Sequence, residues 1–219
     1  MRIRDALALG ALALTVVAAW WLAAWMNKGP MSPSGGLFFP GRFELNVPQF
    51  AQADPRWGGD PLGPTPGTLA AEGCAVASAA MVLAARGVET DPGRLNAFLT
   101  RTPGGYTPRG WIYWEKAPEI LPGLAEAMLP HYEDAPSHFL VDWNLLRGNP
   151  VIARVRLPDG TTHFVVIHGK AGYEYLITDP GTSKNGGRRP LSELAPPVEA
   201  IRFYQPPRPR QGAVPSQTS

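Results

Sequence analysis

The single cysteine of the chain, Cys74, lies where a thiol could act as a nucleophile. It follows Gly73 and opens the alanine-rich stretch 74–85, which has the composition of a helix. At a helix N-terminus, unpaired backbone N–H groups carry partial positive charge and favour a thiolate. The alternative is that Cys74 is a small buried hydrophobic residue without a chemical role. A thiol nucleophile also needs a base, for which histidine is the usual residue.

The chain has four histidines that could supply this base. His163 and His168 lie five residues apart on one expected strand, so their side chains point to opposite faces. His163 comes soon after the hairpin signal Asp159-Gly160, whereas His168 precedes a glycine turn and is expected at the surface. His131 and His138 lie in loop-like sequence and are expected to be solvated. His163 is therefore the favoured base.

The base needs a group that orients its ring, and Asp179 is the candidate. Asp179 ends the strand that follows an expected turn at 169–172. If the strands pair about that turn, Asp179 becomes a cross-strand neighbour of His163. Its carboxylate could then accept a hydrogen bond from the imidazole and fix the tautomer. The alternative is that Asp179-Pro180 only starts a turn.

Attack on a carbonyl also requires donors for the oxyanion that forms. The backbone N–H of Cys74, at the start of its helix, is one candidate. A side-chain amide upstream could be the second, and Gln49 and Gln52 are both available. Together, these residues supply the groups that nucleophilic catalysis by a thiol requires.

The composition excludes several other classes of protein. A formal net charge of +2 with 17% charged residues gives no large field of one sign, so we expect no nucleic-acid partner. One cysteine excludes an intramolecular disulfide framework and a multi-cysteine zinc site. We expect neither a cofactor nor a bound metal.

The N-terminal residues 6–26 form an almost uninterrupted apolar run of the length that crosses a membrane as a helix. Arg2 and Arg4 precede the run, which predicts a cytoplasmic N-terminus and a domain on the periplasmic or extracellular side. Tryptophans cluster at the far end of the run, where aromatic residues favour the membrane interface. The alternative is a cleaved signal peptide and a secreted protein.

We expect four parts along the chain. Residues 1–26 are a membrane anchor, and residues 27–43, rich in Gly, Pro and Ser, are a flexible linker. Residues 44–204 are one folded domain, and residues 205–219 are a disordered, proline-rich tail.

The domain is expected to be helical in its first half and to consist of strands in its second half. The expected helices are 74–85, a second capped by Asp91 and ending near Leu99, and a short one over 143–147 capped by Asp142. The expected strands are 151–157, 161–168, 173–178 and 198–204. Helices followed by an antiparallel sheet indicate an α+β domain.

Several fragments occur in an order that a known family also has. They are Val47-Pro48, Gln52–Trp57, Gly73-Cys74, Ala80–Leu83, Gly148–Ile152, His163–Ile167, Gly169 and Asp179-Pro180. With these fragments, residues 46–182 resemble the C39-like peptidases, which are papain-like cysteine peptidases of bacteria.

The resemblance implies a papain-like cysteine peptidase fold, with the nucleophile at a helix start and a C-terminal antiparallel sheet. It implies that Cys74 is the nucleophile, His163 the base and Asp179 the orienting residue. It also implies that Gln52, rather than Gln49, is the amide of the oxyanion hole.

The chain departs from the family at positions 75–78. There it has Ala-Val-Ala-Ser, where the family often has a glycine and then a Thr-Ser pair. These positions serve packing more than chemistry. The secretion-coupled members of the family are fused to an ATP-driven transporter, whereas this chain has no nucleotide-binding Gly-x-x-x-x-Gly-Lys-Ser/Thr motif. The role of a double-glycine leader peptidase is therefore not carried over.

The sequence therefore predicts a membrane-anchored cysteine peptidase or amidase of the bacterial envelope. This thiol hydrolase would cleave a peptide or amide bond outside the cytoplasm. One alternative is a transglutaminase-like acyltransferase, in which an amine replaces water. Another is a binding module that uses the same fold without catalysis.

Overall fold

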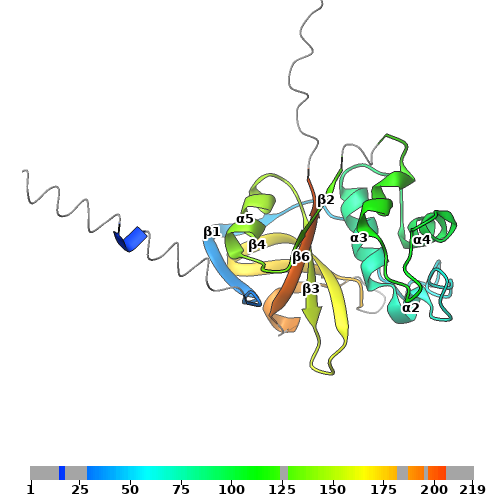
Figure 1. The fold of residues 1–219 in the computed structure, drawn as a ribbon. Coiled ribbons are helices and arrows are strands. Elements are labelled where there is room, and N and C mark those ends of the chain that lie inside the picture. Colours follow the sequence, from blue (N-terminus) through cyan, green and yellow to red (C-terminus); the bar gives the residue numbers. More distant parts are fainter. Residues whose placement is uncertain (1–14, 18–28, 124–127, 182–186, 195–196, 206–219) are drawn as a thin grey trace, which may run out of the picture.

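The computed structural model of the chain describes residues 15–17, 29–123, 128–181, 187–194 and 197–205. A group of helices lies at one end of the domain, and an antiparallel sheet with one further helix forms the other end (Figure 1). This is the α+β arrangement that the sequence predicts, in which two kinds of layer share buried surface.

Helix α3, Cys74–Ala85, is the central helix of the domain. Every residue from Val76 to Leu83 is buried, and small alanines allow the neighbouring elements to approach the helix closely. Gly87 follows its end with a φ of 85°, a conformation that glycine adopts at little cost. The predicted helix over 74–85 is confirmed with these bounds.

Three shorter elements surround α3. Helix α2, Leu69–Glu72, leads directly into it. Helix α4, Pro92–Arg101, begins where predicted, because the Asp91 carboxylate accepts the backbone N–H of Arg94 at 2.8 Å. The 3₁₀ helix η1, Trp114–Ile120, contains a proline and closes the helical part.

Six strands form one antiparallel sheet in the order β1-β4-β3-β6-β2, with β5 pairing on β4. The strands are β1 Ser34–Glu44, β2 Pro130–Glu133, β3 Val151–Arg156, β4 Thr162–Asp179, β5 Gly187–Pro190 and β6 Val198–Tyr204. A 3₁₀ helix, η2 Leu191–Leu194, lies between β5 and β6. The predicted strands over 151–157 and 198–204 are confirmed as β3 and β6.

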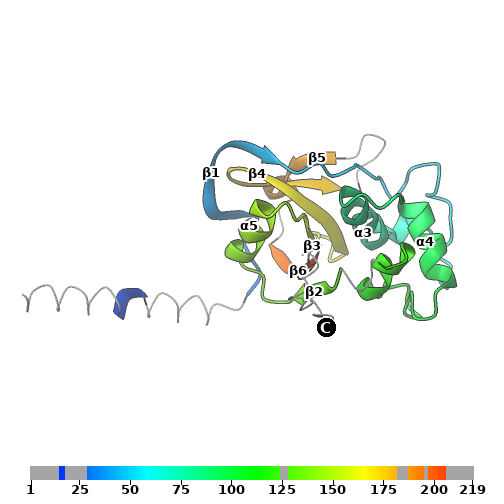
Figure 2. The same cartoon turned by 90° about the horizontal axis from the view of Figure 1, so that it is seen from above.

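Strand β4 doubles back on itself (Figure 2). A straight strand would separate His163 from Asp179 by about 50 Å, yet their side chains meet at 2.7 Å. The reversal is near Gly172, which has a φ of 60°. The turn expected at 169–172 therefore exists, but it lies within one continuous strand, and its residues also pair with β1.

Strand β1 contradicts the prediction that residues 27–43 form a flexible linker. It pairs antiparallel with β4, and the backbone N–H of Leu37 donates to the Asp142 carboxylate at 2.6 Å. Glycine and proline favour a flexible chain locally, but pairing with a distant strand determines the conformation here. The folded part therefore begins before residue 44.

Helix α5, His138–Leu146, differs from the predicted helix over 143–147. Ser137 caps it, and its hydroxyl accepts a backbone N–H at 3.3 Å. The predicted cap, Asp142, lies inside the helix and is fully buried. Its carboxylate accepts a hydrogen bond from Lys170 Nζ at 2.7 Å, a partner from β4 that local sequence does not reveal.

The three histidines outside the predicted site also differ from expectation. His168, predicted at the surface, is fully buried, and burial lowers its pKa to about 4. His131 lies on β2 and His138 begins α5, rather than lying in loops, and both are partly buried. His168 is buried because β1 covers the turn region of β4, and the sequence had suggested no strand there.

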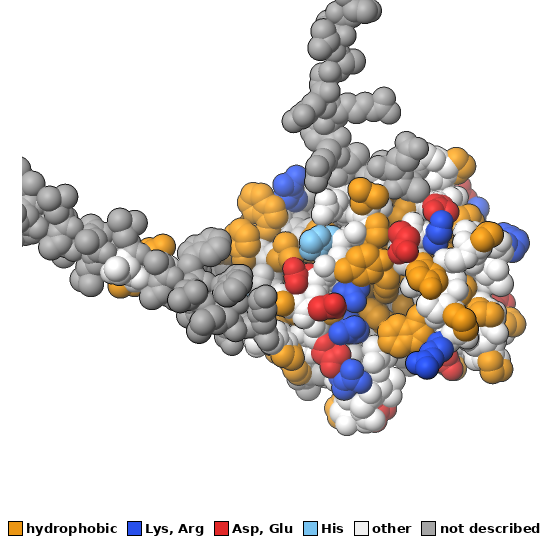
Figure 3. Space-filling model, in the orientation of Figure 1, with side chains coloured by type: hydrophobic (Ala, Val, Ile, Leu, Met, Phe, Trp, Pro, Cys, Tyr) orange, Lys and Arg blue, Asp and Glu red, His pale blue; other side chains and the backbone are white. Residues whose placement is uncertain are grey.

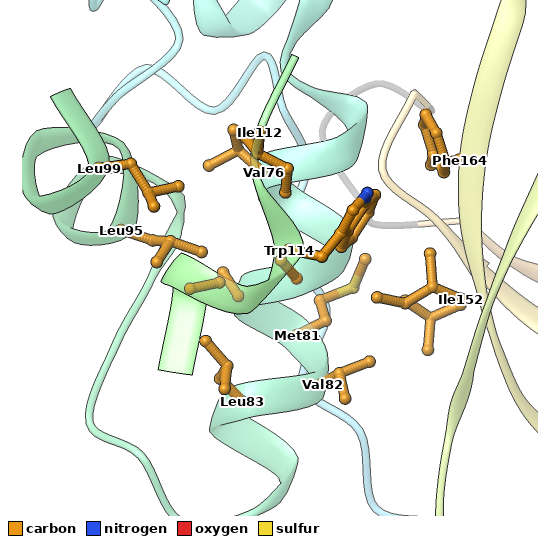
Figure 4. Close-up of a cluster of buried hydrophobic side chains, with 14 of the residues drawn as sticks. Val76, Met81, Val82, Leu83, Leu95, Leu99, Ile112, Trp114, Ile152 and Phe164 are labelled. Carbon is orange, nitrogen blue, oxygen red and sulfur yellow. The ribbon is translucent and has the colours of Figure 1, made fainter. Parts of the chain in front are cut away.

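Two hydrophobic cores lie on opposite faces of the sheet, because successive residues of a strand alternate between its faces. One core packs α3 and α4 against Ile152 and Phe164, and Trp114 fills the space between helices and sheet (Figure 4). The Trp114 and Phe164 rings lie 5.4 Å apart. The other core packs α5 against Val151 and the neighbouring strands.

The expected membrane anchor and tail fall largely outside the described residues. Of the apolar run 6–26, only 15–17 are described, as a single helical turn. Among all the residues that the structure describes, no helix has the length and apolar character needed to cross a membrane. Of the predicted tail, 205–219, only Gln205 is described.

Candidate active site

Cys74 is the first residue of α3, as predicted, and the residue is partly exposed. No side chain caps this helix start, so the first N–H groups of α3 are not occupied by a cap. The φ of Gly73 is −79°, an angle that other residues also adopt, so the backbone angle does not require glycine here. The space around the residue does. A Cβ atom at this position would lie 2.4 Å from the Leu69 carbonyl oxygen.

His163 connects Cys74 to Asp179. Its Nε2 lies 2.7 Å from Asp179 Oδ1, and Cys74 lies close enough to raise the pKa of its ring. Because Nε2 faces the carboxylate, Nδ1 is the nitrogen available to the thiol. The structure thus brings together three residues that are far apart in the sequence, with the imidazole between thiol and carboxylate.

The pKa of His163 is raised to about 9. Burial alone would lower this pKa, but the hydrogen bond with Asp179 and the interactions with Cys74 and the Asp179 charge outweigh it. The imidazolium is therefore favoured at neutral pH. An imidazolium in this position can stabilise a thiolate on one side and donate a proton to a leaving group.

Both oxygens of the Asp179 carboxylate accept hydrogen bonds. Oδ1 accepts hydrogen bonds from His163 and from the backbone N–H of Gly181 at 2.8 Å, and Oδ2 accepts one from the Arg189 guanidinium. Burial alone would raise the pKa of Asp179, but these donors and the charge of His163 lower it. The carboxylate therefore stays ionised and cannot rotate freely.

Arg189 is a residue of this site that sequence reasoning did not identify. It lies on β5, opposite Ile177 of β4. In the sequence it belongs only to the basic pair Arg188-Arg189. No local pattern marks it, because its contact with Asp179 depends on how β5 pairs with β4.

Gln52 reaches the same site from the loop before the helices. Its Nε2 donates to the Ala70 carbonyl at 2.8 Å, which fixes the orientation of the amide. Nε2 carries a second N–H, which remains for another acceptor. The backbone N–H of Gln52 donates to the Pro180 carbonyl at 2.9 Å, so its loop is tied to the turn after Asp179. Gln49, by contrast, is exposed and does not line the cleft.

A cleft of about 240 Å³ contains the thiol, the imidazole and the Gln52 amide. Its remaining lining residues are Leu62, Ala71, Glu72, Ala75, Arg109–Ile112, Trp114, Thr161, Thr162 and Phe164. The walls are the start of α3, the 109–112 loop and the start of β4. Within the described part of the chain, no three His, Cys, Asp or Glu side chains are grouped so that they could hold a metal.

Comparison with solved structures finds the same fold. A protein of Bacillus anthracis described as a C39-like peptidase is 17% identical, with a TM-score of 0.50, over 76% of this chain and 99% of that one. A double glycine motif protease from an AMS/PCAT transporter, solved with the leader peptide, is also 17% identical, with a TM-score of 0.42 over 78% and 99%. At this identity, the similarity to the Bacillus anthracis protein concerns the fold alone.

Comparison with curated proteins finds no significant match. A family model, described as the Peptidase_C39 like family, matches residues 44–196, which are most of the chain and include Gln52, Cys74, His163 and Asp179. The chain therefore belongs to the Peptidase_C39 like family and is a cysteine peptidase.

Proposed function

We propose that the protein hydrolyses a peptide or amide bond, with Cys74 as nucleophile, His163 as acid and base, and Asp179 as the residue that orients the imidazole. The observation that supports this proposal most directly is the 2.7 Å contact between His163 and Asp179, in a cleft that Cys74 and His163 both line. A buried thiol without a chemical role would not need such an arrangement.

The reaction proceeds in two halves. The Cys74 thiolate attacks the carbonyl carbon, and the resulting oxyanion accepts hydrogen bonds from the Cys74 backbone N–H and the free Nε2–H of Gln52. The His163 imidazolium protonates the leaving amine as the C–N bond breaks, which leaves a thioester on Cys74. Water then gives a proton to His163 and attacks the thioester, so that the acid leaves and the thiolate returns.

The lining of the cleft favours a mainly apolar substrate chain. The lining includes the apolar side chains of Leu62, Ile112 and Phe164. Trp111 stands at the rim with 54% of its surface exposed. An exposed tryptophan at the rim provides a flat apolar surface for a bound chain.

Hydrolysis is tested by incubating the purified full chain with a peptide library and identifying new termini by mass spectrometry. We expect products with free carboxylates. Adding a primary amine tests for acyl transfer, because the amine becomes joined to the new C-terminus if it replaces water. If no peptide is cleaved while Cys74 is still alkylated rapidly, the search extends to other amides. If Cys74 is also unreactive, the binding-module alternative is favoured.

We also propose that residues 6–26 anchor the enzyme in the cell membrane and that its domain works outside the cytoplasm. The apolar length of this run, the preceding arginines and the tryptophans at its far end support this proposal. A thiol in that compartment is exposed to oxidation and disulfide exchange, so keeping a single cysteine there fits a chemical role.

The pH dependence of kcat/KM should reveal the protonated form of His163. Its pKa is raised to about 9, so the imidazolium is present below this value and is lost as the pH rises through it. We therefore expect kcat/KM to fall above about pH 9, by about tenfold per pH unit. The profile is measured with one cleaved peptide under pseudo-first-order conditions. A rate that is still constant about two units above this pKa would refute the assignment of His163 as the acid.

A further inference from the structure

The outward face of α5 is unusually apolar. Phe139, Trp143 and Leu146 are 70%, 49% and 55% exposed, and their spacing of four and three residues places them in one stripe. The Phe139 and Trp143 rings stack at 6.2 Å, and the Arg147 guanidinium lies 5.6 Å from the Trp143 ring centre. Figure 3 shows hydrophobic side chains gathered over α5. Because the only acidic residue of α5, Asp142, is fully buried, this face carries a positive charge and no carboxylate.

Further apolar side chains lie at the same end of the domain. Leu37 and Phe38 of β1 are exposed, and Tyr173 of β4 packs edge-on against Phe38 at 5.2 Å. Both views of the fold place α5 and β1 at the end opposite α4 (Figures 1 and 2). Scattered single hydrophobic residues are normal on a protein surface, whereas a group of this kind indicates a binding face.

The apolar run in the sequence before the domain limits how far this face can lie from a membrane. Met31 is buried, exchanges two backbone hydrogen bonds of 2.8 Å with Val198, and packs in the same core as the inner side of α5. The apolar run ends at Met26, five residues earlier. Five residues span at most about 17 Å, whereas a domain of this size has a radius of gyration of about 15 Å. A membrane anchor would therefore hold the α5 end close to the bilayer.

We propose that the outward face of α5, Phe139, Trp143 and Leu146 with Arg147, rests on the lipid bilayer. This proposal depends on the proposed anchoring through residues 6–26. The aromatic rings enter the headgroup region, where tryptophan is favoured, and Arg147 binds lipid phosphate. The opposite, helical end of the domain then faces away from the membrane.

The test uses single spin labels on the full chain. Cys74→Ala removes the native cysteine, and one new cysteine is placed at Phe139, at Leu146, or at Ala97 on α4, which is an exposed helical control. A fourth variant, Leu22→Cys, reports on the apolar run. Each protein is reconstituted into vesicles of phosphatidylethanolamine and phosphatidylglycerol. Collision rates with oxygen, which concentrates in the bilayer, and with an aqueous nickel chelate are measured by electron paramagnetic resonance.

We expect the oxygen-to-nickel collision ratio to be several-fold higher at 139, 146 and 22 than at 97. If position 22 is in lipid but 139 and 146 match 97, the docking proposal is overturned and the anchor stands. If 139 and 146 are sheltered from both reagents, protein rather than lipid covers the face, and the proposal is also overturned. If position 22 is aqueous, anchoring and docking both fail, while peptide cleavage remains a separate result. Unfolding transitions of the labelled variants are compared with that of Cys74→Ala to confirm an intact fold.

Discussion

Replacing Cys74 with alanine is expected to lower kcat by about 10⁴–10⁶-fold, because loss of the nucleophile removes the covalent pathway and leaves only binding and oxyanion stabilisation. The same substitution should abolish labelling by iodoacetamide at neutral pH, since the chain has no other cysteine. In the wild-type protein, labelling should be faster than that of a free thiol. Initial rates on a cleaved peptide and the mass of the alkylated protein measure the two effects.

The helix itself supplies a matched control. Ser78 lies one turn further along α3, is buried, and its hydroxyl has no hydrogen-bond partner among the described residues. Ser78→Ala therefore changes a similar volume in the same helix and should retain wild-type kcat and labelling. If wild-type Cys74 reacts no faster than a free thiol, or if Cys74→Ala still turns over, Cys74 is not an activated nucleophile.

The helices that position Cys74 could be predicted because their signals are local. Helix α3 follows from its alanine content and from Gly87 just beyond its end, and α4 follows from Asp91 at its cap. The meeting of His163 with Asp179 was also predictable, because two residues at equal distances from one turn become neighbours when the chain reverses.

The features that could not be predicted depend on contacts between distant segments. Strand β1 looks flexible by composition and is ordered by pairing with β4. Asp142 has the sequence context of a helix cap, but it is buried and accepts a hydrogen bond from Lys170. Arg189 reaches Asp179 only through the pairing of β5 with β4. Local propensity carries no information about such partners. The sequence therefore predicts the reacting groups better than the distant residues that hold them in place.

Removing the Asp179 carboxylate is expected to have the second largest effect. Asp179→Ala should lower kcat on the order of 10⁴-fold, because His163 loses the acceptor that fixes its ring and stabilises its charge. The pKa of His163 should also fall, since burial lowers it and a group that raised it is gone. We therefore expect the alkaline fall of kcat/KM to move well below pH 9. Asp179→Asn keeps an acceptor oxygen and should lose less activity.

Substitutions of two arginines on β5 distinguish the role of Asp179 from a general loss of charge or stability. Arg189→Gln removes a donor to Asp179 and should lower kcat less than Asp179→Ala does. Arg188→Gln removes the same charge from the neighbouring position, where the guanidinium contacts Glu44 and the Val47 carbonyl. It should retain wild-type kcat and pH profile, and thermal unfolding reports its stability. If Asp179→Ala keeps both the wild-type kcat and the wild-type fall of kcat/KM at alkaline pH, the carboxylate does not orient His163. Only Cys74 and His163 would then be catalytic residues.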